Sequence, residues 1–234
     1  MKKNIAIITA RGGSKRIPKK NIKDFLGKPI IKYSIEAAIS SGIFDEVMVS
    51  TDSQEIAQIA LKCGAKVPFL RSEKNSDDYS TTADVILEVL ESYKNNNEKF
   101  EYACCIYPTA PFVTAEKLQK SFQMLVENNA ESIVPVCQFG YPIWRSLKIE
   151  DEKLSMNFPE NMLKRSQDLS PAYHDAGQFY MIDVGKFLVS QKLFSNHTLA
   201  LVVSELEVQD IDNETDWKLA EMKYEMMRNL VFLI

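Results

Sequence analysis

The stretch NIAIITARGGSKRIPKKN, residues 4–21, joins an apolar run to a turn that contains two glycines and five cationic side chains. The run at 4–9 has the length and composition of a buried β-strand. A basic, Gly-rich turn after such a strand is one arrangement that binds phosphate, although a solvated surface turn has a similar composition. The choice between these two interpretations depends on what the rest of the chain brings to the same place.

Strand and helix patterns alternate along the chain. Helical periodicity marks residues 29–40, 53–63, 82–93 and 115–127, and a last helix begins near residue 215. Apolar runs typical of strands lie at 46–51, 66–70, 102–108, 132–137, 178–183 and 199–204. This alternation predicts an α/β fold of three layers, with helices on both faces of a mostly parallel sheet.

Residues 138–175 interrupt this alternation, within what we expect to be a single domain spanning residues 1–234. They are rich in aromatic residues, prolines and isolated charges, and they have no clear period. Such a stretch predicts an excursion from the main sheet rather than another strand and helix.

Composition limits the classes of function. Of the 234 residues, 45% are hydrophobic and 26% are charged, as in ordinary soluble globular proteins. The net charge of −4 argues against nucleic-acid binding and favours a small anionic ligand for the basic turn. The first apolar run is too short for a signal sequence or a membrane span, which predicts a cytoplasmic protein. The four cysteines, at 63, 104, 105 and 137, form no C-x-x-C pair, so we expect reduced core thiols.

Four polar segments follow predicted strands, namely the basic turn, STDS at 50–53, YPTAPF at 107–112 and VQDIDNETD at 208–216. Because the carboxyl ends of parallel strands meet at one edge of a sheet, we expect these segments to converge. The basic turn lacks the spacing of a P-loop and of a dinucleotide-binding loop. It offers the amides of Gly12 and Gly13, flanked by Arg11 and Lys15, with Lys20 beyond a proline.

Asp210 and Asp212 are separated by one residue, so their carboxylates share one side of an extended strand end. Two oxygen ligands on one side suit Mg²⁺, which completes its coordination with water and substrate phosphates. The alternative is helix capping by Asp212 or Asp216. Cations on phosphate together with a carboxylate-held Mg²⁺ indicate nucleotidyl or phosphoryl transfer.

ARGGSKRIPKKN resembles the signature of the sugar-acid cytidylyltransferases, the CMP-N-acetylneuraminate synthetase family. VSTDS, FLRSEKNSDDYS, YPTAPF and DIDNETD follow in the family's order, so the resemblance covers nearly the whole chain. It implies a nucleotide-diphosphosugar transferase-like, Rossmann-like fold, a homodimer, and a requirement for CTP and Mg²⁺. The implied reaction transfers CMP from CTP to the anomeric hydroxyl of a nonulosonic sugar acid and releases pyrophosphate.

The resemblance also implies roles for single residues. Arg11, Lys15 and Lys20 look like catalytic cations that position and neutralise the triphosphate, and Asp210 and Asp212 look like metal ligands. The nucleotide site looks like one formed by Ala10, Arg11, Gly12, Gly13, Ser14, Lys15, Lys20, Asn21, Arg71, Ser80 and Thr82. The candidates near the sugar are Tyr107, Arg165, His174, Gln178 and Tyr180, with a structural role as the alternative for His174.

Two differences from the sialic acid enzymes bear on the sugar. YPTAP stands where those enzymes have QPTSP, so Tyr107 replaces a glutamine, and RSQDLSPAYHDAGQFY replaces an ending of the RPNGAIY type. Both resemble the subgroup that activates pseudaminic acid, which we therefore prefer over N-acetylneuraminic and legionaminic acid. A non-catalytic CTP sensor on the same fold is the alternative from another class. The presence of both aspartates favours the enzyme.

Aromatic residues are dense in and around residues 138–175, as is typical of a core or a subunit interface. We therefore expect this excursion to reach a partner subunit, so that each sugar pocket borrows residues from its neighbour.

Overall fold

The structure is a computed structural model that describes residues 3–231, so residues 1–2 and 232–234 of the expected domain lie outside it. Its helices are α1 (Ile31–Ser41), α2 (Gln54–Lys62), α3 (Thr82–Asn95), α4 (Ala115–Glu127), α5 (Val184–Ser190) and α6 (Glu214–Val231). Its strands are β1 (Asn4–Thr9), β2 (Asp24–Phe25), β3 (Lys28–Pro29), β4 (Glu46–Ser50), β5 (Tyr102–Ile106), β6 (Ser132–Gln138), β7 (Leu147–Glu150), β8 (Lys153–Met156), β9 (Tyr173–Asp175), β10 (Phe179–Asp183) and β11 (Thr198–Val203).

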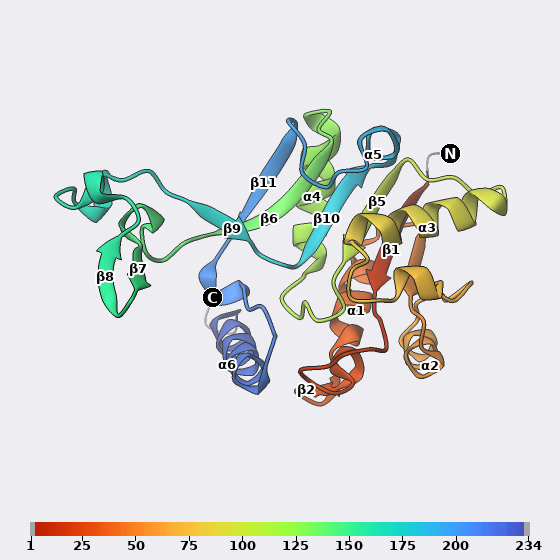
Figure 1. Cartoon of the computed structure of the whole chain (residues 1–234). Coiled ribbons are helices and arrows are strands. Elements are labelled where there is room, and N and C mark those ends of the chain that lie inside the picture. The colour runs from red at the N-terminus through yellow and green to blue at the C-terminus, as the bar shows by residue number, and fades with distance from the viewer. Residues whose placement is uncertain (1–2, 232–234) are drawn as a thin grey trace.

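The main sheet has the strand order β11-β6-β10-β5-β1-β4, and β9 pairs with β6 (Figure 1). β1 runs parallel to β4 and β5, and β11 runs parallel to β6. β10 is antiparallel to both of its neighbours, and β9 is antiparallel to β6. The chain returns into β9 and β10 from the carboxyl end of β6 without a crossover helix, and this direction of entry makes the sheet mixed.

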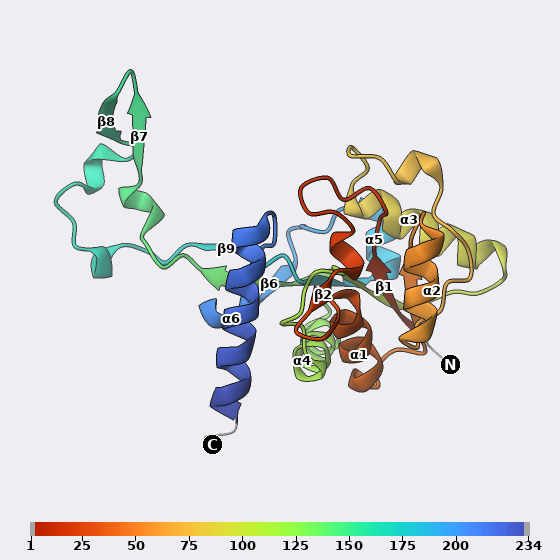
Figure 2. The same ribbon diagram turned by 90° about the horizontal axis from the view of Figure 1, so that it is seen from below.

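Helices cover both faces of the sheet, which confirms the predicted three layers. In β1, Ile5 and Ile7 pack into a cluster with α3 and α5, whereas Ala6 and Ile8 pack into a cluster with α1, α2 and α4. Figure 2 shows α1 and α4 on one side of the sheet and α3 and α5 on the other. The apolar run of β1 therefore reflects burial on both faces.

The predicted strand at 66–70 is wrong. Lys66 forms an isolated bridge with Met48, and the pairing ends there. Pro68 lacks a backbone donor, so it cannot extend a ladder along β4. The prediction for the cysteines is confirmed, because all four are free thiols and Cys104, Cys105 and Cys137 are buried.

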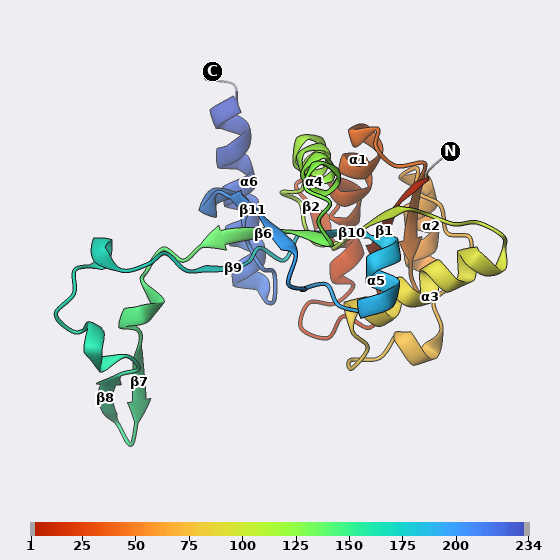
Figure 3. The same cartoon turned by 90° about the horizontal axis from the view of Figure 1, so that it is seen from above.

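Residues 138–175 leave the end of the sheet after β6 and return through β9 (Figures 1 and 3). They carry the antiparallel hairpin β7–β8, whose side chains are largely exposed. Within residues 3–231, no helix combines the length and the apolar character needed to cross a membrane.

A third apolar cluster joins α6 to the region that follows β1. Phe25 of the β2–β3 hairpin packs edge-on against Trp217 of α6, with ring centroids 5.6 Å apart. Ile17 of the basic turn and Ile211 of the aspartate segment are both buried in this cluster, each with 1% of its surface exposed. Two segments almost 200 positions apart are thus held together by packing.

Candidate functional site

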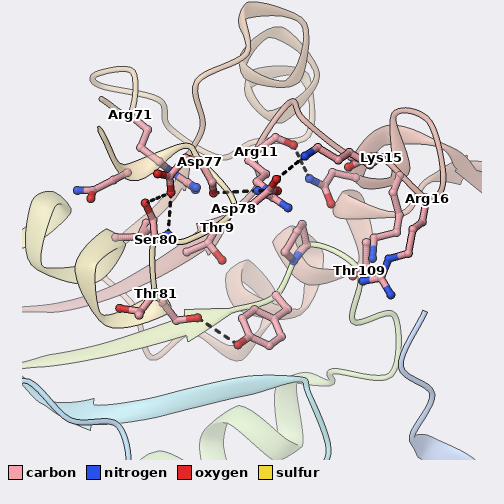
Figure 4. Close-up of a pocket in the computed structure, with 18 of the residues that line it drawn as sticks. Thr9, Arg11, Lys15, Arg16, Arg71, Asp77, Asp78, Ser80, Thr81 and Thr109 are labelled. Carbon is pink, nitrogen blue, oxygen red and sulfur yellow. Dashed lines mark hydrogen bonds and ion pairs between the residues drawn. The ribbon is translucent and has the colours of Figure 1, made fainter. Parts of the chain in front are cut away.

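A pocket of about 550 Å³ opens at the carboxyl ends of β1, β4 and β5 (Figure 4). Four parts of the chain line it: residues between 9 and 21, residues between 71 and 85, residues 107–109, and Asp210. Three of the four strand-end segments expected to converge therefore line this pocket, whereas STDS at 50–53 lies outside its lining and contacts the basic turn through Asp52.

The basic turn and the aspartate segment meet at this pocket. Arg16 forms an ion pair with Asp212, with 2.6 Å between Nη1 and Oδ2. The Lys20 ammonium donates to the backbone carbonyl of Ile211 at 2.6 Å and lies 4.0 Å from the Asp212 carboxylate. Burial lowers the pKa of Lys20, against the opposing effect of Asp212.

The other two catalytic candidates contact an acidic loop across the pocket. Arg11 donates from Nη1 to the Asp77 carbonyl at 2.8 Å and to the Asp78 carboxylate at 2.7 Å. Lys15 donates to the second oxygen of Asp78. Hydrogen bonds from Lys15 and Arg11 lower the pKa of Asp78.

Asp77 and Asp78 were not among the predicted site residues. They lie in the KNSDDYS stretch of the quoted motif FLRSEKNSDDYS, immediately before α3. The signal in the sequence that could have identified them is their place just before the start of a helix. What the sequence could not give was their partners, which lie more than 60 positions away.

Gly12 serves a different contact from the one expected. Its amide donates to Asp52 Oδ1 at 2.7 Å, and a Cβ at this position would approach the Ser53 Cβ to 3.1 Å. A side chain here would therefore press on Ser53 and displace it by a few tenths of an ångström, which favours glycine for packing on the STDS loop. Ala10 is buried and donates to the Ser50 carbonyl, and Gly13 also lies outside the set of residues that line the pocket.

Five further nucleotide-site candidates do line the pocket: Ser14, Asn21, Arg71, Ser80 and Thr82. Asn21 fixes the basic turn by donating to the Arg11 carbonyl at 2.8 Å. Arg71 is buried and donates to the Ser50 backbone and side chain, at 2.5 and 3.0 Å. Burial lowers the pKa of its guanidinium.

The sugar candidates divide into two groups. Tyr107 lines the pocket, and its hydroxyl shares a 3.2 Å hydrogen bond with the Thr82 hydroxyl. Its ring lies edge-on to that of Tyr180, with the ring centroids 5.8 Å apart. Tyr180 is buried behind it and donates its hydroxyl to Asp175. Tyr107, backed by Tyr180, therefore forms an aromatic wall beside the residues predicted to bind the nucleotide.

The remaining three sugar candidates lie away from this pocket in the same chain. Gln178 is buried and donates to the Glu207 carbonyl at 2.6 Å. His174 makes a 2.8 Å hydrogen bond with the Asp175 carbonyl and packs on Phe139, which favours the structural alternative. Arg165 lies in the excursion, where it pairs with Asp168 at 2.8 Å.

The aspartate segment differs from the expected strand end. β11 ends at Val203, and a 3-10 turn, η6 (Glu205–Glu207), intervenes before Asp210. Asn213 accepts from the amides of Thr215 and Asp216, and Asp216 accepts from the amides of Asp212 and Asn213. Capping is therefore correct for Asp216 and wrong for Asp212.

The donor chemistry at this segment suits Mg²⁺. Asp210 is an exposed carboxylate that lines the pocket, and Asp212 stands two residues away. Within residues 3–231 no group of three or more His, Cys, Asp or Glu side chains is gathered into a metal cage. An ion held by one or two carboxylates together with substrate phosphates needs no such cage.

Comparison with known proteins bears directly on this pocket. A family model described as "Cytidylyltransferase" matches residues 5–212. The chain belongs to the cytidylyltransferase family. The expected class, a nucleotidyltransferase, is thereby confirmed, and the basic turn and both Asp210 and Asp212 fall within the matched range.

Relatives of this cytidylyltransferase cover its full length. The pseudaminic acid cytidylyltransferase of Campylobacter jejuni subsp. jejuni serotype O:2 is 42% identical over 231 residues, covering 98% of this chain and 100% of the relative. The CMP-N,N'-diacetyllegionaminic acid synthase of Legionella pneumophila is 32% identical, covering 95% and 96%. A solved structure of CMP:2-keto-3-deoxy-manno-octonic acid synthetase complexed with CTP aligns with a TM-score of 0.70 at 16% identity, covering 97% of this chain and 99% of that one. The expected fold is confirmed.

The ion pairs of Asp78 lead to a prediction about the affinity for CTP. Replacing Asp78 with Asn frees Arg11 and Lys15 from a competing anion, so the Kd for CTP without added metal should fall roughly two- to fivefold, the range expected for exposed ion pairs. Isothermal titration calorimetry measures this change. Glu91→Gln, which removes an equal charge from the exposed face of α3, is the matched control. Weaker CTP binding by Asp78→Asn alone would show that Asp78 supports the nucleotide rather than competing with it.

Proposed function

We propose that this cytidylyltransferase transfers CMP from CTP to the anomeric hydroxyl of a nonulosonic acid, pseudaminic acid, and releases pyrophosphate. The observation that carries the proposal is that one pocket is lined by Arg11, Lys15 and Lys20 together with Asp210. Full-length identity of 42% to a pseudaminic acid cytidylyltransferase supports both the donor and the acceptor. A pocket with cations and a carboxylate supplies the charges that displacement at phosphorus needs.

In the proposed reaction, the anomeric oxygen forms a bond to the α-phosphorus of CTP. The bond from that phosphorus to the bridging oxygen breaks, pyrophosphate leaves with the electron pair, and the hydroxyl proton is released. Arg11, Lys15 and Lys20 hold the phosphate oxygens in line and neutralise their charge. To do so, Arg11 and Lys15 exchange Asp78 for the triphosphate. Asp210 and Asp212 would hold Mg²⁺, which supplies further neutralisation of phosphate charge when bound.

The aromatic wall supports the choice of sugar acid. Tyr107 lines the pocket, and Tyr180 packs edge-on behind it with its hydroxyl donated to Asp175. Where sialic acid enzymes carry a glutamine, this wall offers a phenol and an apolar ring surface. Such a surface suits a less hydroxylated sugar acid, because a pocket discriminates through the groups it can pair.

A substrate panel tests the proposed function. Pyrophosphate release from CTP is measured with pseudaminic, N-acetylneuraminic and legionaminic acids. We expect kcat/KM for pseudaminic acid to exceed the others by about tenfold or more, as differences in hydrogen-bonding groups commonly produce. Equal values for N-acetylneuraminic acid would refute the preferred sugar. Binding of CTP without release from any of the three acids would instead favour the non-catalytic sensor.

The metal assignment has its own test. Asp210→Asn keeps the size of the side chain but removes its charge, so kcat should fall by about 100-fold or more, as for loss of a charge-stabilising group in other enzymes. Binding of CTP without metal should be retained. Glu127→Gln, an exposed change at the end of α4, is the control. Unchanged Mg²⁺-dependent turnover by Asp210→Asn would remove this residue from the metal site.

We further propose a homodimer formed through the excursion. Its apolar side chains are unusually exposed, with Ile149, Leu154 and Leu163 exposing 74%, 64% and 95% of their surface. Packing on a second copy would cover them and would bring Arg165 to a neighbouring pocket. We also propose that residues 1–234 form one domain and that the protein is located in the cytoplasm, where CTP is available.

The proposed dimer predicts the effect of charged substitutions in its interface. Ile149→Asp together with Leu154→Asp should yield a monomer by analytical ultracentrifugation, because charges would be buried in the proposed interface. The monomer should bind CTP normally, whereas its KM for the sugar acid should rise about tenfold or more through loss of the partner's contribution. A verified monomer with full activity would refute the shared pocket.

A further inference from the structure

Lys117 of α4 is a charged residue in a largely buried position, outside the pocket that binds the proposed substrates. Its side chain is 12% exposed and forms an ion pair with Glu207, with 2.8 Å between Nζ and Oε1. The same ammonium donates to the backbone carbonyl of Phe112 at 2.9 Å. Burial lowers the pKa of Lys117, and Glu207 opposes this effect. Such a pair costs desolvation energy, so it is weak evidence for a purely stabilising role.

The two partners of Lys117 belong to two chain segments that each contribute residues to the pocket. Phe112 ends the YPTAPF segment, in which residues 107–109 line the pocket. Glu207 closes the 3-10 turn η6, three residues before Asp210. A single ammonium group therefore contacts both the loop beside the aromatic wall and the turn that leads to the proposed metal ligand.

The turn η6 is also held from two other sides. Gln178 at the start of β10 donates to the Glu207 carbonyl at 2.6 Å. Lys223 of α6 donates to the Val208 carbonyl at 2.7 Å and to the Glu205 carbonyl at 3.2 Å. Helix α4, strand β10 and helix α6 thus fix the backbone immediately before Asp210, whereas the Asp210 side chain itself is exposed.

These contacts give Gln178 a function other than direct sugar contact. Its amide nitrogen is committed to Glu207, and its Oε1 is buried without a partner among residues 3–231. Its backbone carbonyl accepts from the Tyr107 amide at 2.9 Å. Gln178 therefore joins the same two segments that Lys117 joins, through different atoms of Glu207.

We infer that Lys117, together with Glu207 and Gln178, forms a positioning site that sets the place of the Asp210 segment relative to the 107–112 loop and so determines the affinity of the enzyme for Mg·CTP. This inference rests on the proposed function, because it takes Asp210 as a metal ligand. Lys117 itself touches neither substrate, so it acts only through the two loops. A purely structural role would stabilise the fold without changing the metal response.

Four variants separate these roles. Lys117→Met keeps length and removes the charge, Glu207→Gln removes the partner charge, and the double variant removes both. Lys120→Met, at an exposed position of the same helix, is the matched control. The single variants should melt at a lower temperature because one buried charge stays unpaired, and the double variant should recover part of that loss.

The deciding measurement is binding rather than turnover. CTP binding is titrated by calorimetry without metal and with increasing Mg²⁺. For Lys117→Met and for the double variant we expect the half-saturating Mg²⁺ concentration to rise roughly 10- to 100-fold, the range seen when groups that support metal ligands are lost. CTP binding without metal should change less than about twofold, within the range of exposed charge effects. Backbone amides at 209–213 should exchange with deuterium faster in both variants.

The possible failures are distinguishable. A folded double variant with the Mg²⁺ response and amide exchange of the wild type would overturn the inference and leave the proposed function intact. A wild type in which Mg²⁺ has no effect on CTP binding, with Asp210→Asn behaving identically, would overturn the metal assignment itself and the inference with it. If Lys117→Met fails to fold, Glu207→Gln and the double variant still decide the outcome.

Discussion

The burial of Ile17 and Ile211 in one apolar cluster is the contact on which the site depends. Each side chain contributes about 1.5–3 kcal/mol when fully buried. The exposed ion pair between Arg16 and Asp212 contributes about 0–1 kcal/mol, so it would not hold two flexible loops by itself. Packing of Phe25 and Trp217 in the same cluster as the two isoleucines holds the loops together, so the charges lie at set positions. The fold thus places opposite charges around a pocket through apolar contacts just outside it.

In this arrangement, three cations near the pocket form ion pairs with carboxylates of the same chain. Arg11 and Lys15 face Asp78, and Arg16 faces Asp212. Because the partners are exposed carboxylates, exchanging them for phosphate oxygens costs little, and the cations need not reorganise far. Lys20 differs, since it is more buried and held by a backbone carbonyl. Among Arg11, Lys15 and Lys20 it has the least exposed side chain, which in the proposed reaction suits a group that aligns one phosphate.

The elements that periodicity predicted are those whose burial pattern repeats locally. β1 is apolar on both faces, and α4 begins and ends at its predicted residues. The direction of β10 was not predictable, because it depends on where the excursion returns. The same limit applies to the site. The cations and aspartates were predictable from residue type, whereas the partner of Gly12, the Asp78 contacts and the turn of Gln178 toward Glu207 are set by contacts 29 to 67 positions apart.

The sheet divides the proposed reaction between its two halves. Most nucleotide candidates follow the parallel strand β1, and the rest lie in the segment that leads into α3. The antiparallel strands β9 and β10 carry His174 and Tyr180, and β9 follows the excursion. The relatives named for pseudaminic and legionaminic acids differ in the sugar acid that their names give. A donor site on rigid parallel strands can stay constant while an acceptor wall on the antiparallel side changes. Tyr107 lies where the two halves meet, since it follows β5 and packs against Tyr180 of β10, so a change there alters the acceptor wall without disturbing the cations.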